Sequence, residues 1–141
     1  MKEYEKLLYQ ANAAPSRLAM LFLVFNTWQC IFTLNAIDVA AGGIRVMEII
    51  LTNILLSFLV FITAFEIKRY SSRWSWAGLG IGIFQCLRIF YAPVGLHPVI
   101  PSIALPLLAA GIFLIIASLW SQVLCRKYRA AKKEQACHTS A

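Results

Sequence analysis

Residues 101–124 read PSIALPLLAAGIFLIIASLWSQVL, a stretch of twenty-four residues without a formal charge. A helix needs about 20 apolar residues to cross a hydrocarbon core of ~30 Å, and this stretch meets that length. A water-soluble domain of 141 residues has too small an interior to bury so much apolar surface. The stretch therefore predicts a helix that spans a lipid bilayer.

Three more apolar stretches precede it in the chain. Residues 18–36 carry no charge, and residues 46–65 carry a single acid, Glu48. Residues 77–92 are fewer and carry a single base, Arg88. This shorter stretch also fits a re-entrant or interfacial segment, although the tryptophans just before it favour anchoring in the headgroup region. We expect an all-α membrane protein, with four transmembrane helices in a compact bundle.

The composition supports a helical membrane protein over other classes. Hydrophobic residues make up 60% of the chain and charged residues 13%, about half the ~25% usual for soluble domains. The apolar stretches lack the alternation of transmembrane strands, and helices satisfy every backbone group internally. The four cysteines form no C-x-x-C pair, so the sequence predicts neither a disulfide framework nor a zinc site.

The basic residues predict an orientation. Eleven of the thirteen lysines and arginines lie in the N-terminal arm, between the second and third spans, or in the tail. Arg45 and Arg88 are the other two. Because basic loops stay inside, we expect both termini in the cytoplasm of a multi-pass plasma-membrane protein. The net charge of +7 then faces anionic lipid headgroups, which are a simpler partner than nucleic acid.

The two ends of the chain are expected to lie outside the spans. Residues 1–14 have apolar positions at helical spacing, which predicts a short amphipathic helix on the membrane or a frayed terminus. Pro15 is expected to end that helix, and residues 125–141 to form a basic cytoplasmic tail. A cleaved signal peptide is the alternative for the first span, but its apolar stretch exceeds the usual length.

A polar cluster is predicted near the outer ends of the spans. Glu48 and Arg88 have matching depths, and Asp38 and His97 lie in the outer loops. Ionisable residues within a span indicate a functional site by default, here one that binds a headgroup, an ion or a solute. The alternative is a structural Glu48–Arg88 ion pair, or an Arg88 side chain that extends outward to the headgroups.

Other polar residues lie deeper in the spans. They are Asn26 and Gln29 in the first, Asn53 and Ser57 in the second, and Gln85 in the third. They either line a polar path or, more commonly, form hydrogen bonds between helices. Small residues also recur, as Gly78 and Gly82 in the third span and at every seventh position of the fourth. These stripes predict close helix packing, either within the chain or with another subunit.

The sequence offers no catalytic set. Both histidines lie outside the spans, and we find no Ser-His-Asp combination, metal cluster or phosphate loop, so no enzyme, cofactor or metal is predicted. We expect a non-catalytic subunit or scaffold that packs against a homo-oligomer or a larger membrane subunit. The four-span plan is similar to that of small membrane subunits of some multi-component transporters. An oligomeric transporter or channel component and an outer-leaflet lipid-modifying enzyme are the alternatives.

Overall fold

The computed structural model describes residues 3–36, 43–91 and 101–140. These residues are almost entirely helical and include no strand, which confirms the predicted all-α class. The helices are α1 (Glu3–Ala36), α2 (Gly43–Lys68), α3 (Ser72–Leu87) with the 3-10 segment η2 (Arg88–Tyr91), and α4 (Pro101–Thr139).

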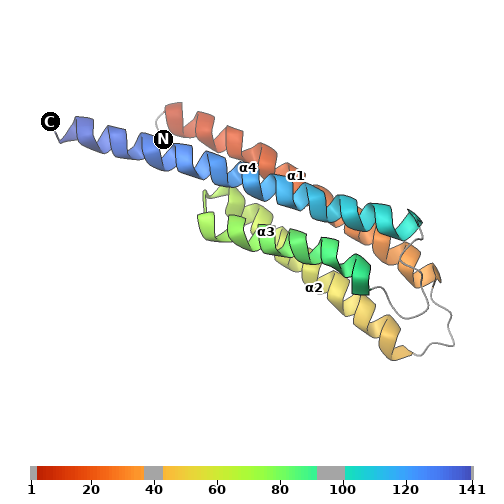
Figure 1. Cartoon of the computed structure of the whole chain (residues 1–141). Coiled ribbons are helices and arrows are strands. Elements are labelled where there is room, and N and C mark those ends of the chain that lie inside the picture. Colours follow the sequence, from red (N-terminus) through yellow and green to blue (C-terminus); the bar gives the residue numbers. More distant parts are fainter. Residues whose placement is uncertain (1–2, 37–42, 92–100, 141) are drawn as a thin grey trace.

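Successive helices run in opposite directions along one bundle (Figure 1). The start of α1, the turn between α2 and α3, and the end of α4 lie at the same end, which we call the terminal end. The end of α1, the start of α2, η2 and the start of α4 lie at the other end, which we call the distal end. In this arrangement α4 packs against both α1 and α3, while α2 packs mainly against α1.

Three helical segments are long and apolar enough to cross a membrane: Ala13–Ala36, Gly43–Lys68 and Ile103–Thr139. The first two segments contain the first and second predicted spans, and the third overlaps all but two residues of the fourth predicted span. α3 has 16 residues and falls below the length that identifies a span by itself. The described chain is therefore a four-helix bundle with three helices that fit a membrane protein.

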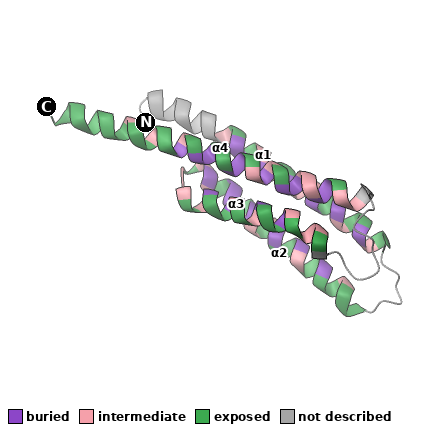
Figure 2. Ribbon diagram, viewed as in Figure 1, coloured by how far each residue is buried: buried purple, intermediate pink, exposed green. Residues whose placement is uncertain are grey.

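The apolar side chains are distributed as in a protein surrounded by hydrocarbon. The buried core is modest in size: Phe22, Val60 and Leu114 are fully buried, and several alanines complete it. By contrast, many of the described leucine, isoleucine and phenylalanine side chains lie on the outside of the helices (Figure 2). In water this surface would favour aggregation, whereas lipid tails cover it without cost.

The predicted break at Pro15 is wrong, because α1 runs without interruption through that residue. A proline inside a helix removes one backbone hydrogen bond and costs about 3 kcal/mol in isolation. Here Pro15 is fully buried, and the hydroxyl of Ser16 donates to the Ala64 carbonyl of α2 at 2.8 Å. Tertiary contacts thus hold the helix together where local propensity would end it. The residues from Glu3 onward form the first turns of α1 and no separate amphipathic helix.

The helix of the fourth predicted span does not end where the tail was expected to begin. α4 continues to Thr139, well past residue 125, and extends beyond the rest of the bundle at the terminal end (Figure 1). Its side chains are largely exposed from Arg126 onward. Tyr128 stacks on Tyr70 of the α2–α3 turn, with ring centroids 4.6 Å apart, and this contact joins the base of the extension to the bundle.

The glycine stripe of α3 packs against α4 of the same chain. A Cβ atom added at Gly82 would lie 2.8 Å from Cγ1 of Ile115 and 3.0 Å from the Gly111 carbonyl oxygen. A Cβ atom at Gly78 would lie 2.5 Å from the Ser118 hydroxyl oxygen. At Gly82 the neighbouring atoms include the backbone of α4, so the close approach there requires glycine, whereas at Gly78 the neighbours are side-chain atoms of Ser118 and Thr63. The sequence had left open whether this stripe meets another subunit.

We expect Gly82→Ala to lower the free energy of unfolding by about 1–3 kcal/mol, as overpacking does in other cores. The new methyl group would meet the backbone of α4, which cannot move aside as a side chain can. Reversible unfolding of the purified protein in mixed detergent micelles measures the effect. Gly80→Ala is the matched control, since a Cβ atom there meets nothing within 4 Å. Equal stability of the two variants would contradict the close α3–α4 contact.

Candidate functional site

Arg88 lies at the junction of α3 and η2, and its side chain points back into the bundle. Nη1 donates to Oε1 of Gln85 at 2.9 Å and to Oδ1 of Asn53 at 3.4 Å. Gln85 is one turn deeper than Arg88, and helical side chains incline toward the N-terminus of their helix. The guanidinium is half-buried between α2 and α3. It therefore does not extend outward to the headgroups, as one interpretation of the sequence had it.

A chain of amide groups continues from Arg88 into the centre of the bundle. Nε2 of Gln85 donates to Oδ1 of Asn26 at 3.0 Å. Nδ2 of Asn26 donates in turn to Oγ of Ser57 at 3.0 Å and to the Asn53 carbonyl at 3.3 Å. Asn26, Asn53 and Gln85 are all buried. These hydrogen bonds connect α1, α2 and α3. We call the five residues that make them the amide network: Asn26, Asn53, Ser57, Gln85 and Arg88.

The side-chain amide of Gln85 determines the direction in which the hydrogen bonds of this network run from donor to acceptor. Its nitrogen donates to Asn26, so its oxygen is the end that accepts from Arg88. The Asn53 amide is arranged in the same sense, because its nitrogen donates to the Ile49 carbonyl at 2.8 Å and its oxygen faces Arg88. Two amide oxygens thus bind the guanidinium, and both contribute partial rather than full negative charge.

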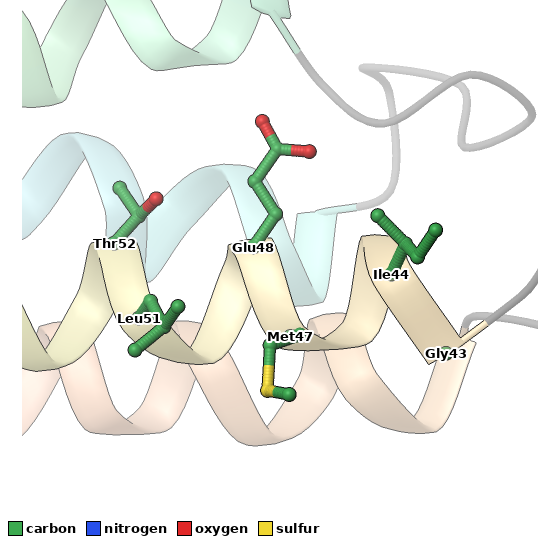
Figure 3. A pocket seen from close by; sticks show the side chains of 6 residues that line it. All are labelled: Gly43, Ile44, Met47, Glu48, Leu51 and Thr52. Carbon is green, nitrogen blue, oxygen red and sulfur yellow. The ribbon is translucent and has the colours of Figure 1, made fainter.

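Glu48 lies nearby on α2 but does not pair with Arg88. In the part of the chain that the structure describes, the ion pair is Arg69–Glu66 at 3.3 Å, at the terminal end. Glu48 instead lines an open hollow of about 620 Å³ along the first turns of α2. Figure 3 shows its carboxylate pointing away from α2, toward the side on which α3 ends. The lining described for this hollow is Gly43, Ile44, Met47, Glu48, Leu51 and Thr52.

The other polar residues singled out in the sequence do not belong to the amide network as described. Asp38 and His97, which were predicted to lie near Glu48 and Arg88, are outside the residues that the structure describes. Gln29 is buried but bonds within α1, where its Nε2 donates to the Thr33 hydroxyl at 2.8 Å. Glu48 lies in the first turns of α2 and Arg88 at the start of η2, and both of these helix ends lie at the distal end of the bundle (Figure 1).

One hydrogen bond between α3 and α4 was not predicted from the sequence. The Ser75 and Ser121 hydroxyls share a hydrogen bond of 2.9 Å between α3 and α4, and both side chains are buried. Serine at the start of one span and near the end of another is a weak signal, because serine is common at such positions. The only sequence indication was the stripe of small residues on α4, whose member Ser118 lies one turn from Ser121.

No group of three or more histidine, cysteine, aspartate or glutamate side chains that could hold a metal ion occurs among the described residues. Comparison with protein-family models, with curated proteins and with solved structures gives no match to this chain.

We expect Asn26 and Gln85 to be energetically coupled. In a double-mutant cycle of Asn26→Ala and Gln85→Ala, the coupling free energy should be about 0.6 kcal/mol and at most ~1.7 kcal/mol, the range for hydrogen bonds between membrane helices. Unfolding in mixed micelles gives the four stabilities. As a control, Thr27→Ala and Gln85→Ala should be additive, because Thr27 is exposed and its hydroxyl donates to the Leu23 carbonyl of its own helix. Additivity of the Asn26 and Gln85 variants would argue against the network.

Proposed function

We propose that this chain is a non-catalytic subunit or scaffold of the plasma membrane, which crosses the bilayer four times and acts by packing its helices against a partner. The observation that carries the proposal is that polar and small side chains face the interior of the bundle, whereas large apolar side chains face outward. Described polar and small residues of the spans bond or pack within the chain, at the amide network and the glycine stripe. Large apolar side chains remain on the outside, available to lipid and to other membrane helices.

The fourth crossing is supported by the continuity of α3 and η2. At ~1.5 Å per residue, the 16 residues of α3 extend about 24 Å. At ~2.0 Å per residue, the four residues of η2 add about 8 Å. Together they match a hydrocarbon core of ~30 Å. The segment also runs alongside the other helices between the two ends of the bundle (Figure 1).

The orientation is supported by the distribution of basic residues over the two ends. Lys68, Arg69 and Arg73 flank the α2–α3 turn, at the terminal end, where the basic extension of α4 also lies. Arg45 and Arg88 are the basic residues of the distal end. The positive-inside tendency then favours a cytoplasmic terminal end, with both termini inside.

Labelling of cysteines with a membrane-impermeant maleimide tests this topology on intact cells. We expect the exposed Cys137 to react only after the cells are permeabilised. Gly43→Cys, combined with Cys137→Ser, should react without permeabilisation, because Gly43 is exposed at the distal end. The reverse pattern would show an inverted protein. Equal labelling of both positions would place the two ends of the bundle on the same side of the membrane and would contradict this topology.

α2 offers the broadest apolar surface for a partner. Nine of its large apolar side chains are exposed: Ile44, Met47, Ile50, Leu51, Ile54, Leu55, Phe58, Phe61 and Phe65. They follow the length of the helix on its outward side, and α2 lies at the edge of the bundle (Figure 1). Aromatic and long aliphatic side chains on an edge helix suit packing against another transmembrane helix. We therefore assign the partner contact to this outward side of α2.

A photo-crosslinking amino acid at position 58 tests the assignment in cells. We expect a crosslinked protein species at this position, and a complex of the same composition on a blue-native gel. Position 116 on α4 is the matched control, since Ile116 is also an exposed apolar residue of a span. Crosslinks to lipid alone at both positions, with a monomeric protein in mild detergent, would count against the scaffold function.

The two alternative functions have less support. A transporter needs a polar path through the bundle, but the side-chain amides of Asn26 and Gln85 are bonded to each other and to Ser57 and Arg88. A lipid-modifying enzyme needs a nucleophile and a base within reach of each other, and Glu48 is the one described carboxylate of the distal end, with no ion pair to Arg88. Binding without chemistry is the role that remains for the distal polar residues.

A further inference from the structure

We propose that Arg88 binds the phosphate group of a phospholipid headgroup at the distal end of the bundle. This binding site goes beyond the scaffold function and does not depend on it, since it would exist in a monomer. The site consists of the guanidinium, the amide oxygens of Gln85 and Asn53 that orient it, and the Glu48 carboxylate, which points toward the side on which α3 ends.

The guanidinium is held by one of its three nitrogens. Both hydrogen bonds that Arg88 makes with described side chains come from Nη1. Nη2 and Nε form the opposite edge of the fork, which presents two parallel N–H groups. This edge is the one that binds two oxygens of a phosphate or carboxylate at the same time. The amide oxygens therefore fix the orientation of the group and leave its bidentate edge for an oxyanion.

The charge of Arg88 has no counter-charge among the described residues. Its two partners are neutral amides, and Glu48 makes no ion pair there. A half-buried cation in an apolar bundle is costly unless an anion or water neutralises it. An arginine near the end of a span can usually reduce that cost by extending to the headgroups, but here it is turned inward. The inward position instead favours an anion that comes to Arg88.

Arg88 is only half-buried and lies at the start of η2, so its guanidinium is accessible from the distal end of the bundle. The hollow on the first turns of α2 lies at the same end, and its described lining includes Glu48 but neither Arg88 nor Asn53. Glu48 lies five residues before Asn53, about 7.5 Å along the helix axis. Its carboxylate repels a free phosphate ion but attracts the amine of a zwitterionic headgroup, so the surroundings favour phosphatidylethanolamine over inorganic phosphate.

Native mass spectrometry of the full-length, delipidated protein in mild detergent tests the site. The wild type should retain phosphatidylethanolamine and should not retain diacylglycerol with the same acyl chains, because the latter lacks the phosphate. Arg88→Gln should weaken the retention about tenfold or more, as expected for loss of a charge-assisted hydrogen-bonded contact. Arg45→Gln is the matched control: it removes the same charge from an exposed arginine at the same end, and should leave retention unchanged.

Two further measurements identify the source of the phosphate and control for a folding defect of the variant. Displacement of the lipid by millimolar inorganic phosphate would support an oxyanion site but assign it to a soluble anion. Arg88→Lys keeps the charge, loses the fork, and should bind with intermediate affinity. If Arg88→Gln does not fold, the wild-type comparison of phosphatidylethanolamine with diacylglycerol still decides. Equal retention of these two lipids, or equal affinity of the Arg88→Gln and Arg45→Gln variants, would overturn the proposal.

Discussion

In a hydrocarbon environment, each polar group between the helices needs a partner within the protein, and this constraint explains most of the described interior. Without water, an unsatisfied amide costs several kcal/mol. Asn26, Gln85 and Asn53 satisfy one another across three helices, and Ser75 bonds to Ser121 across another interface. Each of these bonds also fixes the register of two helices. The hydrogen bonds that satisfy the buried polar groups therefore also determine how the helices are arranged.

The same environment removes the usual reason for helices to associate. Lipid tails are as apolar as leucine, so apolar contact alone gives little preference for one packing over another. Close backbone approach then becomes the second determinant. Gly82 and Gly111 allow α3 and α4 to meet with no side chain between them. The amide network holds α1, α2 and α3 together, while the glycine stripe joins α3 to α4. Since α3 takes part in both, the shortest α-helix is joined to each of the other three by a specific contact.

The sequence predicted the helices better than their ends and partners. Long apolar stretches identify membrane helices because hydropathy is a local property, and α1, α2 and α4 contain the stretches expected. Pro15 was misjudged because its local preference is overridden by contacts with α2, which are remote in sequence. The partner of Gly82 and the direction of Arg88 depend on how two helices meet, and one residue pattern is compatible with several such arrangements. Asp38 and His97 lie outside the described residues, so that part of the predicted cluster stays a prediction.

Arg88 is the residue that packing alone does not explain. A methionine or leucine in its place would fill a similar volume and avoid the desolvation of a charge, and such replacements often stabilise other proteins. The amides of Gln85 and Asn53 could then have bonded within their own helices or to each other. Instead their oxygens converge on one nitrogen of a guanidinium that faces inward. An arrangement that fixes the orientation of a half-buried cation is typical of binding sites, where preorganisation of the binding group matters.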